Sequence, residues 1–290
     1  MKGTTARLQF DPSVAAFGVR ISASYLATYR VTYLAIFLLL LSLLTAGPAF
    51  ALPDELEVHL DETTPKGEFG FDMVSNYTFA GPRRLSDETE KLRSSVHLLQ
   101  ISPSLSYGIA SNTQIGLQLF SSIGPGGETR VDGGRVELIS VPIRPDDDDD
   151  DGFFLGGLLE VGHLPRTLSA NRLDAEIKMI VGYRTGRWTF ASNPEVGFKV
   201  AGDGSSLPEF SIKLKTAYRI NQTTSIGLEH FGDLGELHHL GHLNQQSQQT
   251  FAVVDLKAGE MEFNLGLGRG WTDVSERWVL KTIVSFPFGK

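Results

Sequence analysis

From residue 68 onward, apolar and polar residues alternate along most of the chain. Phe69, Phe71 and Met73, for example, are separated by Gly70 and Asp72. A helix would repeat its apolar positions every three or four residues, so a period of two predicts a β-strand. The alternation persists for about a dozen residues, roughly twice the length of a globular strand and close to that of a tilted membrane strand.

The same pattern recurs along the rest of the chain and predicts about twelve strands, an even number as a single-chain membrane barrel requires. Short turns, such as Ser111-Asn112 and Thr185-Gly186-Arg187, alternate with longer loops. Two segments, 134–143 and 249–257, keep no clean parity, so ten or fourteen strands are the alternatives. The expected strands are 68–80, 94–110, 113–123, 134–143, 153–163, 172–184, 188–200, 209–220, 224–232, 249–257, 261–269 and 277–288.

Short turns at one rim and longer loops at the other are typical of a transmembrane barrel. A soluble β-sandwich has shorter strands, and a lipocalin-like barrel has about eight strands with hydrocarbon inside. We therefore predict an all-β fold, a transmembrane antiparallel up-and-down β-barrel formed by residues 67–290. The aromatic residues expected at its two interfaces are Tyr77, Phe79, Tyr107, Trp188, Tyr218, Trp278 and Phe288.

Residues 1–51 have the features of a signal peptide with an extended N-terminal region. Arg30 precedes the apolar stretch 31–47, which is followed by Pro48-Ala49-Phe50-Ala51, a small-x-small cleavage site. A membrane-anchoring helix is the alternative, and the helix-breaking Gly47-Pro48 pair disfavours it. We expect the mature protein to begin after residue 51, with residues 52–66 as a periplasmic segment that precedes the barrel.

Composition and charge narrow the function further. The chain has no cysteine, which excludes disulfides, thiolate metal sites and thiol nucleophiles. Its formal net charge is −8, and removal of the leader would take away four basic residues and one acidic residue, which leaves the mature chain with 22 basic and 33 acidic residues, or −11. Such a chain lacks the basic face that nucleic acids require. We expect membrane lipid as a partner, no nucleic acid and no cofactor.

Charged residues point into the lumen in any register that turns the apolar face of each strand to lipid. They would either hold water in a pore or pair across it and close it. Between residues 172 and 219 the inward-facing bases outnumber the acids, so this wall is expected to favour anions, unless acids of later strands neutralise it. The candidate lumen-lining residues are Asp174, Glu176, Lys178, Glu195, Lys199, Lys213, Lys215, Arg219, Glu229, Glu262 and Lys281.

An acidic turn is a candidate calcium site. Asp147, Asp149 and Asp151, followed by Gly152, have the spacing at which alternate oxygens wrap a hard cation. Position twelve of such a loop would be Leu158 instead of a bidentate glutamate. A solvated turn whose like charges repel is the alternative.

A histidine cluster is a candidate transition-metal site. His238 and His242 are four residues apart, which would place both imidazoles on one face if this loop were helical. Glu236 could add an oxygen ligand. Solvated loop histidines without a metal are the alternative.

Several stretches resemble bacterial outer-membrane β-barrel proteins of the porin and transporter type. They are 107–112 (YGIASN), 182–189 (GYRTGRWT), Asn193-Pro194 and 268–278 (GRGWTDVSERW). As a pattern, the resemblance covers most of residues 67–288. It implies an outer-membrane location and recognition of the C-terminal strand by the barrel-assembly machinery. Phe288 fits the terminal aromatic residue of that signal, although Gly289-Lys290 follow it.

Twelve strands enclose a lumen wider than that of an eight-stranded barrel and narrower than that of a sixteen-stranded porin. We therefore expect a narrow channel for small polar or anionic solutes. A closed structural or interaction barrel that acts through its loops is the alternative. A lipid hydrolase would use serine and histidine on the outer face, but the sequence has no G-x-S-x-G motif, and we expect no enzymatic activity.

Overall fold

The computed structural model describes residues 56–82, 94–145, 151–163, 171–202, 207–238 and 240–288. All of them belong to one compact unit, Ala46–Lys290. The expected leader, residues 1–51, lies outside the described residues. Within the described residues, no helix is long and apolar enough to cross a membrane.

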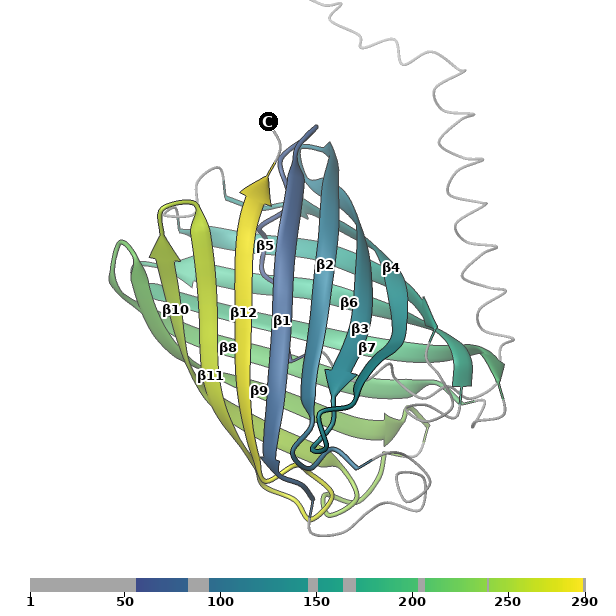
Figure 1. The fold of residues 1–290 in the computed structure, drawn as a ribbon. Helices are drawn as coiled ribbons and strands as arrows, with labels where there is room; N and C mark the ends of the chain where they lie inside the picture. Colours follow the sequence, from purple (N-terminus) through teal and green to yellow (C-terminus); the bar gives the residue numbers. More distant parts are fainter. Residues whose placement is uncertain are drawn as a thin grey trace, which may run out of the picture. The chain divides into compact units, whose positions relative to one another are not determined.

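Twelve antiparallel strands form a closed barrel (Figure 1). Every strand pairs with its neighbours in the sequence, and β1 (Phe69–Ala80) closes the ring by pairing with β12 (Trp278–Phe288). This confirms the predicted up-and-down barrel and its strand number. The other strands are β2 (Leu99–Ala110), β3 (Thr113–Ile123), β4 (Thr129–Ile143), β5 (Gly152–His163), β6 (Asn171–Thr185), β7 (Trp188–Gly202), β8 (Glu209–Asn221), β9 (Thr224–Glu236), β10 (Ser247–Ala258) and β11 (Met261–Gly270).

The outer face of the barrel is apolar between two aromatic rims. Mid-strand apolar residues such as Leu117 are about half exposed on that face. At the short-turn end, the rings of Phe69 and Tyr107 lie 4.9 Å apart. At the long-loop end, the rings of Tyr77 and Phe79 lie 4.8 Å apart. This is the surface of a barrel that faces lipid, with aromatic residues at both interfaces.

The two strands without clean parity, β4 and β10, carry hydrocarbon on their inward faces as well as their outward faces. Ile139 and Val141 of β4, and Phe251 and Val253 of β10, are buried inside the barrel. Polarity therefore did not mark the inward face of these strands. Both strands also begin earlier than predicted, at residues 129 and 247.

The inward hydrocarbon packs against the N-terminal segment, residues 56–64. Leu56 and Val58 are buried in one apolar cluster with Val141, Phe154 and Phe251. The segment had been expected in the periplasm, before the barrel. Its alternating apolar residues instead match the inward hydrocarbon, and the described part of the segment lies within the lumen.

The segment joins the barrel wall at the short-turn end. Lys66 forms an isolated β-bridge with Gly108, and the amide of Gly67 donates to the Gly108 carbonyl at 2.8 Å. A Cβ at Gly108 would lie 2.1 Å from the carbonyl oxygen of Pro65, so the close approach requires glycine there. From this point the chain continues directly into β1.

Candidate functional site

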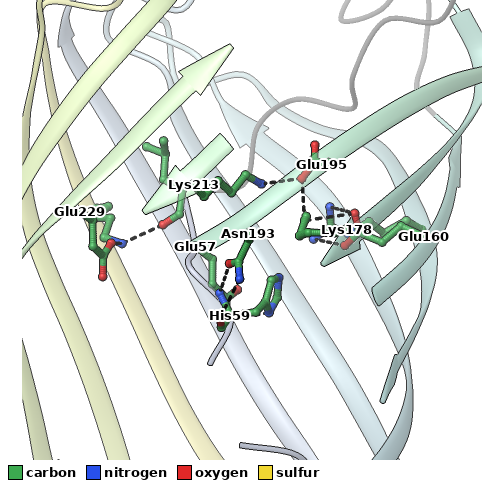
Figure 2. A network of polar contacts seen from close by, with 11 residues as sticks. Glu57, His59, Glu160, Lys178, Asn193, Glu195, Lys213 and Glu229 are labelled. Carbon is green, nitrogen blue, oxygen red and sulfur yellow. Dashed lines mark hydrogen bonds and ion pairs between the residues drawn. The ribbon is translucent and has the colours of Figure 1, made fainter. Parts of the chain in front are cut away.

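One chain of ion pairs joins four neighbouring strands inside the lumen (Figure 2). Lys178 Nζ of β6 lies 3.5 Å from Glu160 Oε2 of β5 and 3.0 Å from Glu195 Oε2 of β7. Lys213 Nζ of β8 lies 3.3 Å from the same Glu195 oxygen. Arg135 of β4 extends the chain, because its Nη2 is 3.2 Å from Glu160 Oε1.

A second cluster is centred on Glu229 of β9. Lys215 Nζ lies 3.1 Å from Glu229 Oε1 and 2.9 Å from Asp255 Oδ1, and Lys281 also pairs with Glu229. The amide of Asn264 donates to Glu229 at 3.0 Å and to Asp255 at 2.6 Å. Strands β8 to β12 all contribute to this cluster.

Most of the charged side chains of these pairs are buried from water. The exposed fraction is 0% for Glu160 and Lys281 and 1% for Lys178, Glu195 and Glu229. A buried charge is tolerated only where a partner and hydrogen bonds offset its desolvation, and each of these charges has such a partner.

The pairing also corrects the expected basic wall. Lys178 and Lys213 share Glu195, and Lys215 pairs with Glu229, an acid of the next strand. Three of the bases that were to attract anions, Lys178, Lys213 and Lys215, are therefore neutralised within the barrel. Arg135 was missed because β4 lacked a readable parity, and Glu160 was missed because the inward face of β5 also carries the hydrocarbon of Phe154 and Leu158.

The middle of the N-terminal segment is held by a backbone clamp. The amide of His59 donates to Asn193 Oδ1 at 2.8 Å, and Asn193 Nδ2 donates to the His59 carbonyl at 3.0 Å (Figure 2). Further along, Lys281 Nζ donates to the Leu56 carbonyl at 2.8 Å. Asn193 is fully buried, so its side-chain amide satisfies its hydrogen bonds with the backbone of His59 and not with bulk water.

Arginines hold the segment closer to the short turns. Arg184 of β6 pairs with the carboxylate of Asp61 and lies 3.2 Å from Glu62 Oε1. Arg144, which follows β4, donates to the Asp61 carbonyl and to Thr63 Oγ1, both at 3.2 Å. The segment is therefore anchored along its described length and not only at its junction with β1.

The pKa values of Glu57 and His59, which lie beside the clamp, are shifted in opposite directions. Burial raises the pKa of Glu57 to about 8, and the carboxylates of Asp72 and Glu137 contribute to this rise. Burial lowers the pKa of His59 to about 3, with the Lys178 ammonium next in importance. Both side chains are therefore held in their neutral forms near neutral pH.

A cavity of about 540 Å³ lies at the short-turn end of the lumen. Residues 57–60 and 62–64 of the segment form part of its wall, and the turns at 186–187 and 221–225 lie at its rim. We call it the turn-end cavity. It is within the size range of small-molecule sites.

Most of the predicted lumen-lining residues are buried on the inward faces of their strands. Lys199 is half-buried, and Arg219, near the short turns, donates to the Gly186 carbonyl at 3.1 Å. Glu262 is half exposed and pairs with Lys257 at 2.9 Å. The buried ones are Asp174, Glu176, Lys178, Glu195, Lys213, Lys215, Glu229 and Lys281.

The candidate calcium loop falls mostly outside the described residues, which include neither Asp147 nor Asp149. Asp151 is described, and its Oδ1 accepts a hydrogen bond from the Gly186 amide at 2.5 Å. This carboxylate therefore caps the turn between β6 and β7. Calcium binding stays a prediction.

The histidine cluster does not have the helical geometry on which the metal prediction depended. His238 is exposed and lies 4.0 Å from Glu236, while residues 240–242 form no helical turn. The four-residue spacing to His242 therefore does not set both imidazoles on one helix face. Among the described residues, no group of three or more potential ligands could hold a metal ion.

His230, which lies on the outer face, forms hydrogen bonds with uncharged side chains. His230 Nδ1 lies 2.9 Å from Thr250 Oγ1, and its Nε2 lies 2.9 Å from Gln248 Oε1. A hydrolase would need a serine on one ring nitrogen and a carboxylate on the other. These contacts do not provide that arrangement.

No family model and no curated protein sequence matches the chain. Among solved structures, the NanC porin matches with a TM-score of 0.50 and 10% identity, covering 76% of this chain and 100% of that one. The KdgM porin in complex with disordered oligogalacturonate matches with a TM-score of 0.49 and 8% identity, over 76% and 99% of the two chains. LpxR from Salmonella typhimurium matches with a TM-score of 0.39 and 8% identity, over 76% and 100%. At these identities the likeness concerns the fold, which is that of the outer-membrane β-barrels, as predicted.

Proposed function

We propose that this outer-membrane barrel is a narrow channel for small polar solutes, closed in the described conformation by residues 56–64. The observation that carries the proposal is the position of this segment. It lies inside a charged lumen, between a cavity that reaches the short turns and a layer of buried, paired charges.

The way the segment is bound supports a removable closure. Its contacts with the wall include hydrogen bonds and ion pairs to side chains such as Asn193 and Arg184. Water or a polar solute can replace such contacts at a modest net cost per bond. A segment held only by apolar contacts could not exchange them for hydrogen bonds to water or a solute.

A closed structural barrel that acts through its loops is the second candidate. The observation that favours it is the buried ion-pair chain from Arg135 to Lys213, which would remain after the segment left. The two candidates therefore differ in what a barrel without its segment does.

Deletion of residues 52–64 behind an intact leader tests the proposal. We expect single-channel conductance in planar bilayers to be rare for the full chain and frequent for the deletion variant. Circular dichroism and urea unfolding in vesicles establish that the variant is still a folded barrel. A folded variant that inserts and never conducts would favour the structural barrel.

The sequence-based preference for anions is not part of this proposal, because carboxylates neutralise Lys178, Lys213 and Lys215. A non-enzymatic role is part of it. So is recognition of β12 by the barrel-assembly machinery, since β12 is the last strand and closes the barrel against β1.

A further inference from the structure

Three carboxylates line the turn-end cavity and, among the residues described, have no lysine or arginine of their own, since Arg135, the main positive charge acting on Glu137, is already paired with Glu160. Asp72 projects from β1, Glu137 projects from β4, and Glu57 faces the cavity from the N-terminal segment. Within the part of the chain that the structure describes, none of the three forms an ion pair with a lysine or arginine. His59 lies 3.8 Å from Glu57, but burial keeps this imidazole neutral by lowering its pKa to about 3.

The wall between these carboxylates is polar and ordered. Ser104 of β2 lies directly opposite Asp72 in the strand register, and Gln118 of β3 lies opposite Ser104. Ser104 is only 5% exposed, lines the cavity, and its Oγ has no hydrogen-bond partner among the described residues. A buried hydroxyl without a partner is costly, so it marks a place for a ligand group or an ordered water.

Gly116 fixes the position of the Glu137 carboxylate. A Cβ at Gly116 would lie 2.3 Å from Glu137 Oε1, so the carboxylate rests on the bare backbone of β3. Glu137 itself is 7% exposed and lines the cavity. The acidic group is therefore held in place and does not sample the solvent freely.

The electrostatics agree with this geometry. Burial raises the pKa of Glu57 to about 8, and the charges of Asp72 and Glu137 are the next contributions, ahead of the opposing Lys281. Near neutral pH burial and this repulsion keep Glu57 protonated, and a bound positive charge would relieve the repulsion and favour the ionised carboxylate.

We propose that Glu57, Asp72, Ser104 and Glu137 form a binding site for the protonated amine of a small cationic solute. The carboxylates accept hydrogen bonds from the ammonium group, and the Ser104 hydroxyl supplies a further acceptor. Asp72 and Glu137 are separated by β2 and β3, and such a spread suits the separate hydrogen-bond donors of an amine better than a chelated metal ion, whose ligands must all lie within about 2.6 Å of it. The site depends on the proposed channel function only in that a channel would place it on a transport path.

The test is calorimetric titration of the folded full chain in detergent with putrescine. Butanediol and succinate, of similar size, serve as neutral and anionic probes. We expect putrescine alone to bind. Glu137→Gln should weaken binding by about tenfold or more, since it replaces a charge-assisted hydrogen bond to the ammonium with a weaker one to a neutral amide oxygen.

Two further variants separate a built site from a general acidic field. Gly116→Ala keeps every charge but displaces the Glu137 carboxylate, and should weaken putrescine binding by a similar factor. Glu262→Gln removes a carboxylate that lines the same cavity but already pairs with Lys257, and should change the affinity by less than about twofold.

Absence of putrescine binding would overturn the site, and so would an equal loss in Glu262→Gln and Glu137→Gln. Urea unfolding in vesicles establishes that each variant is folded. Because binding is measured without conduction, a barrel that binds putrescine and never conducts would refute the channel and leave the site standing.

Discussion

The clamp between Asn193 and His59 predicts how strongly the segment is held. Asn193→Ala removes two hydrogen bonds, of 2.8 and 3.0 Å, from the backbone of His59. At about 1 kcal/mol net for each bond, docking should weaken by about 2 kcal/mol, which is roughly a 30-fold shift toward the undocked segment. The buried His59 amide and carbonyl would then lack these partners, so the figure is a lower bound.

Because the chain has no cysteine, a single introduced cysteine can report on the position of the segment. Leu56→Cys introduces a single thiol at a buried position of the segment, and its maleimide labelling rate in vesicles reports the undocked fraction. We expect labelling about 30-fold faster in the Asn193→Ala background. Asn76→Ala is the matched control, because Asn76 is buried and inward-facing but its Oδ1 has no partner among the described residues. Unchanged labelling in Asn193→Ala, or equal acceleration in both variants, would refute the clamp.

Three further predictions concern the outer face, pH and the buried charges. Leu117→Arg, on the lipid face, should cost about 2–4 kcal/mol of unfolding free energy in vesicles, whereas Ser285→Arg, at the turn-end cavity, should cost little; equal costs would contradict the assigned faces. Because the pKa of Glu57 is raised to about 8 in the docked state, the stability of docking is complete below the ordinary glutamate pKa and is lost as the pH rises through about 8. Labelling of the same thiol, corrected for thiol ionisation, should therefore accelerate with pH, and Glu57→Gln should abolish this dependence. Lys281→Met should cost about 3–5 kcal/mol because it breaks a buried pair, and Lys257→Met, at an exposed pair, about 0–1 kcal/mol; urea unfolding compares the two, and similar costs would contradict the burial argument.

The strands could be predicted closely because lipid imposes a single rule on the outer face. β8 was expected at 209–220 and is observed at Glu209–Asn221. Its inward lysines, Lys213 and Lys215, alternate with outward hydrocarbon at Ile212 and Leu214. Every outward residue of a membrane strand must be compatible with hydrocarbon, so the pattern survives in a single sequence.

The interior follows no such rule, and there the sequence was less informative. The inward face of β10 holds Phe251 and Val253 because another part of the chain packs against it. The N-terminal segment could be recognised in the sequence by the alternation of Leu56, Val58 and Leu60. Three apolar positions after an export signal do not show, however, which strands they pack against. The ion pairs likewise depend on the register between strands, which the alternation of a single sequence does not fix.

The contacts of the segment also imply competition between closure and solute binding. The backbone of residues 56–59 occupies the amide of Asn193 and one donor of Lys281. When the segment leaves, these buried groups must find water or a polar solute, because an unpaired buried donor is costly. A solute that binds them is therefore expected to favour the undocked state. An amine bound between Glu57 and the opposite wall would have the reverse effect, because it bridges the segment to Asp72 and Glu137. The same lumen would then respond in opposite directions to solutes that bind its middle and to cations that bind its turn-end cavity.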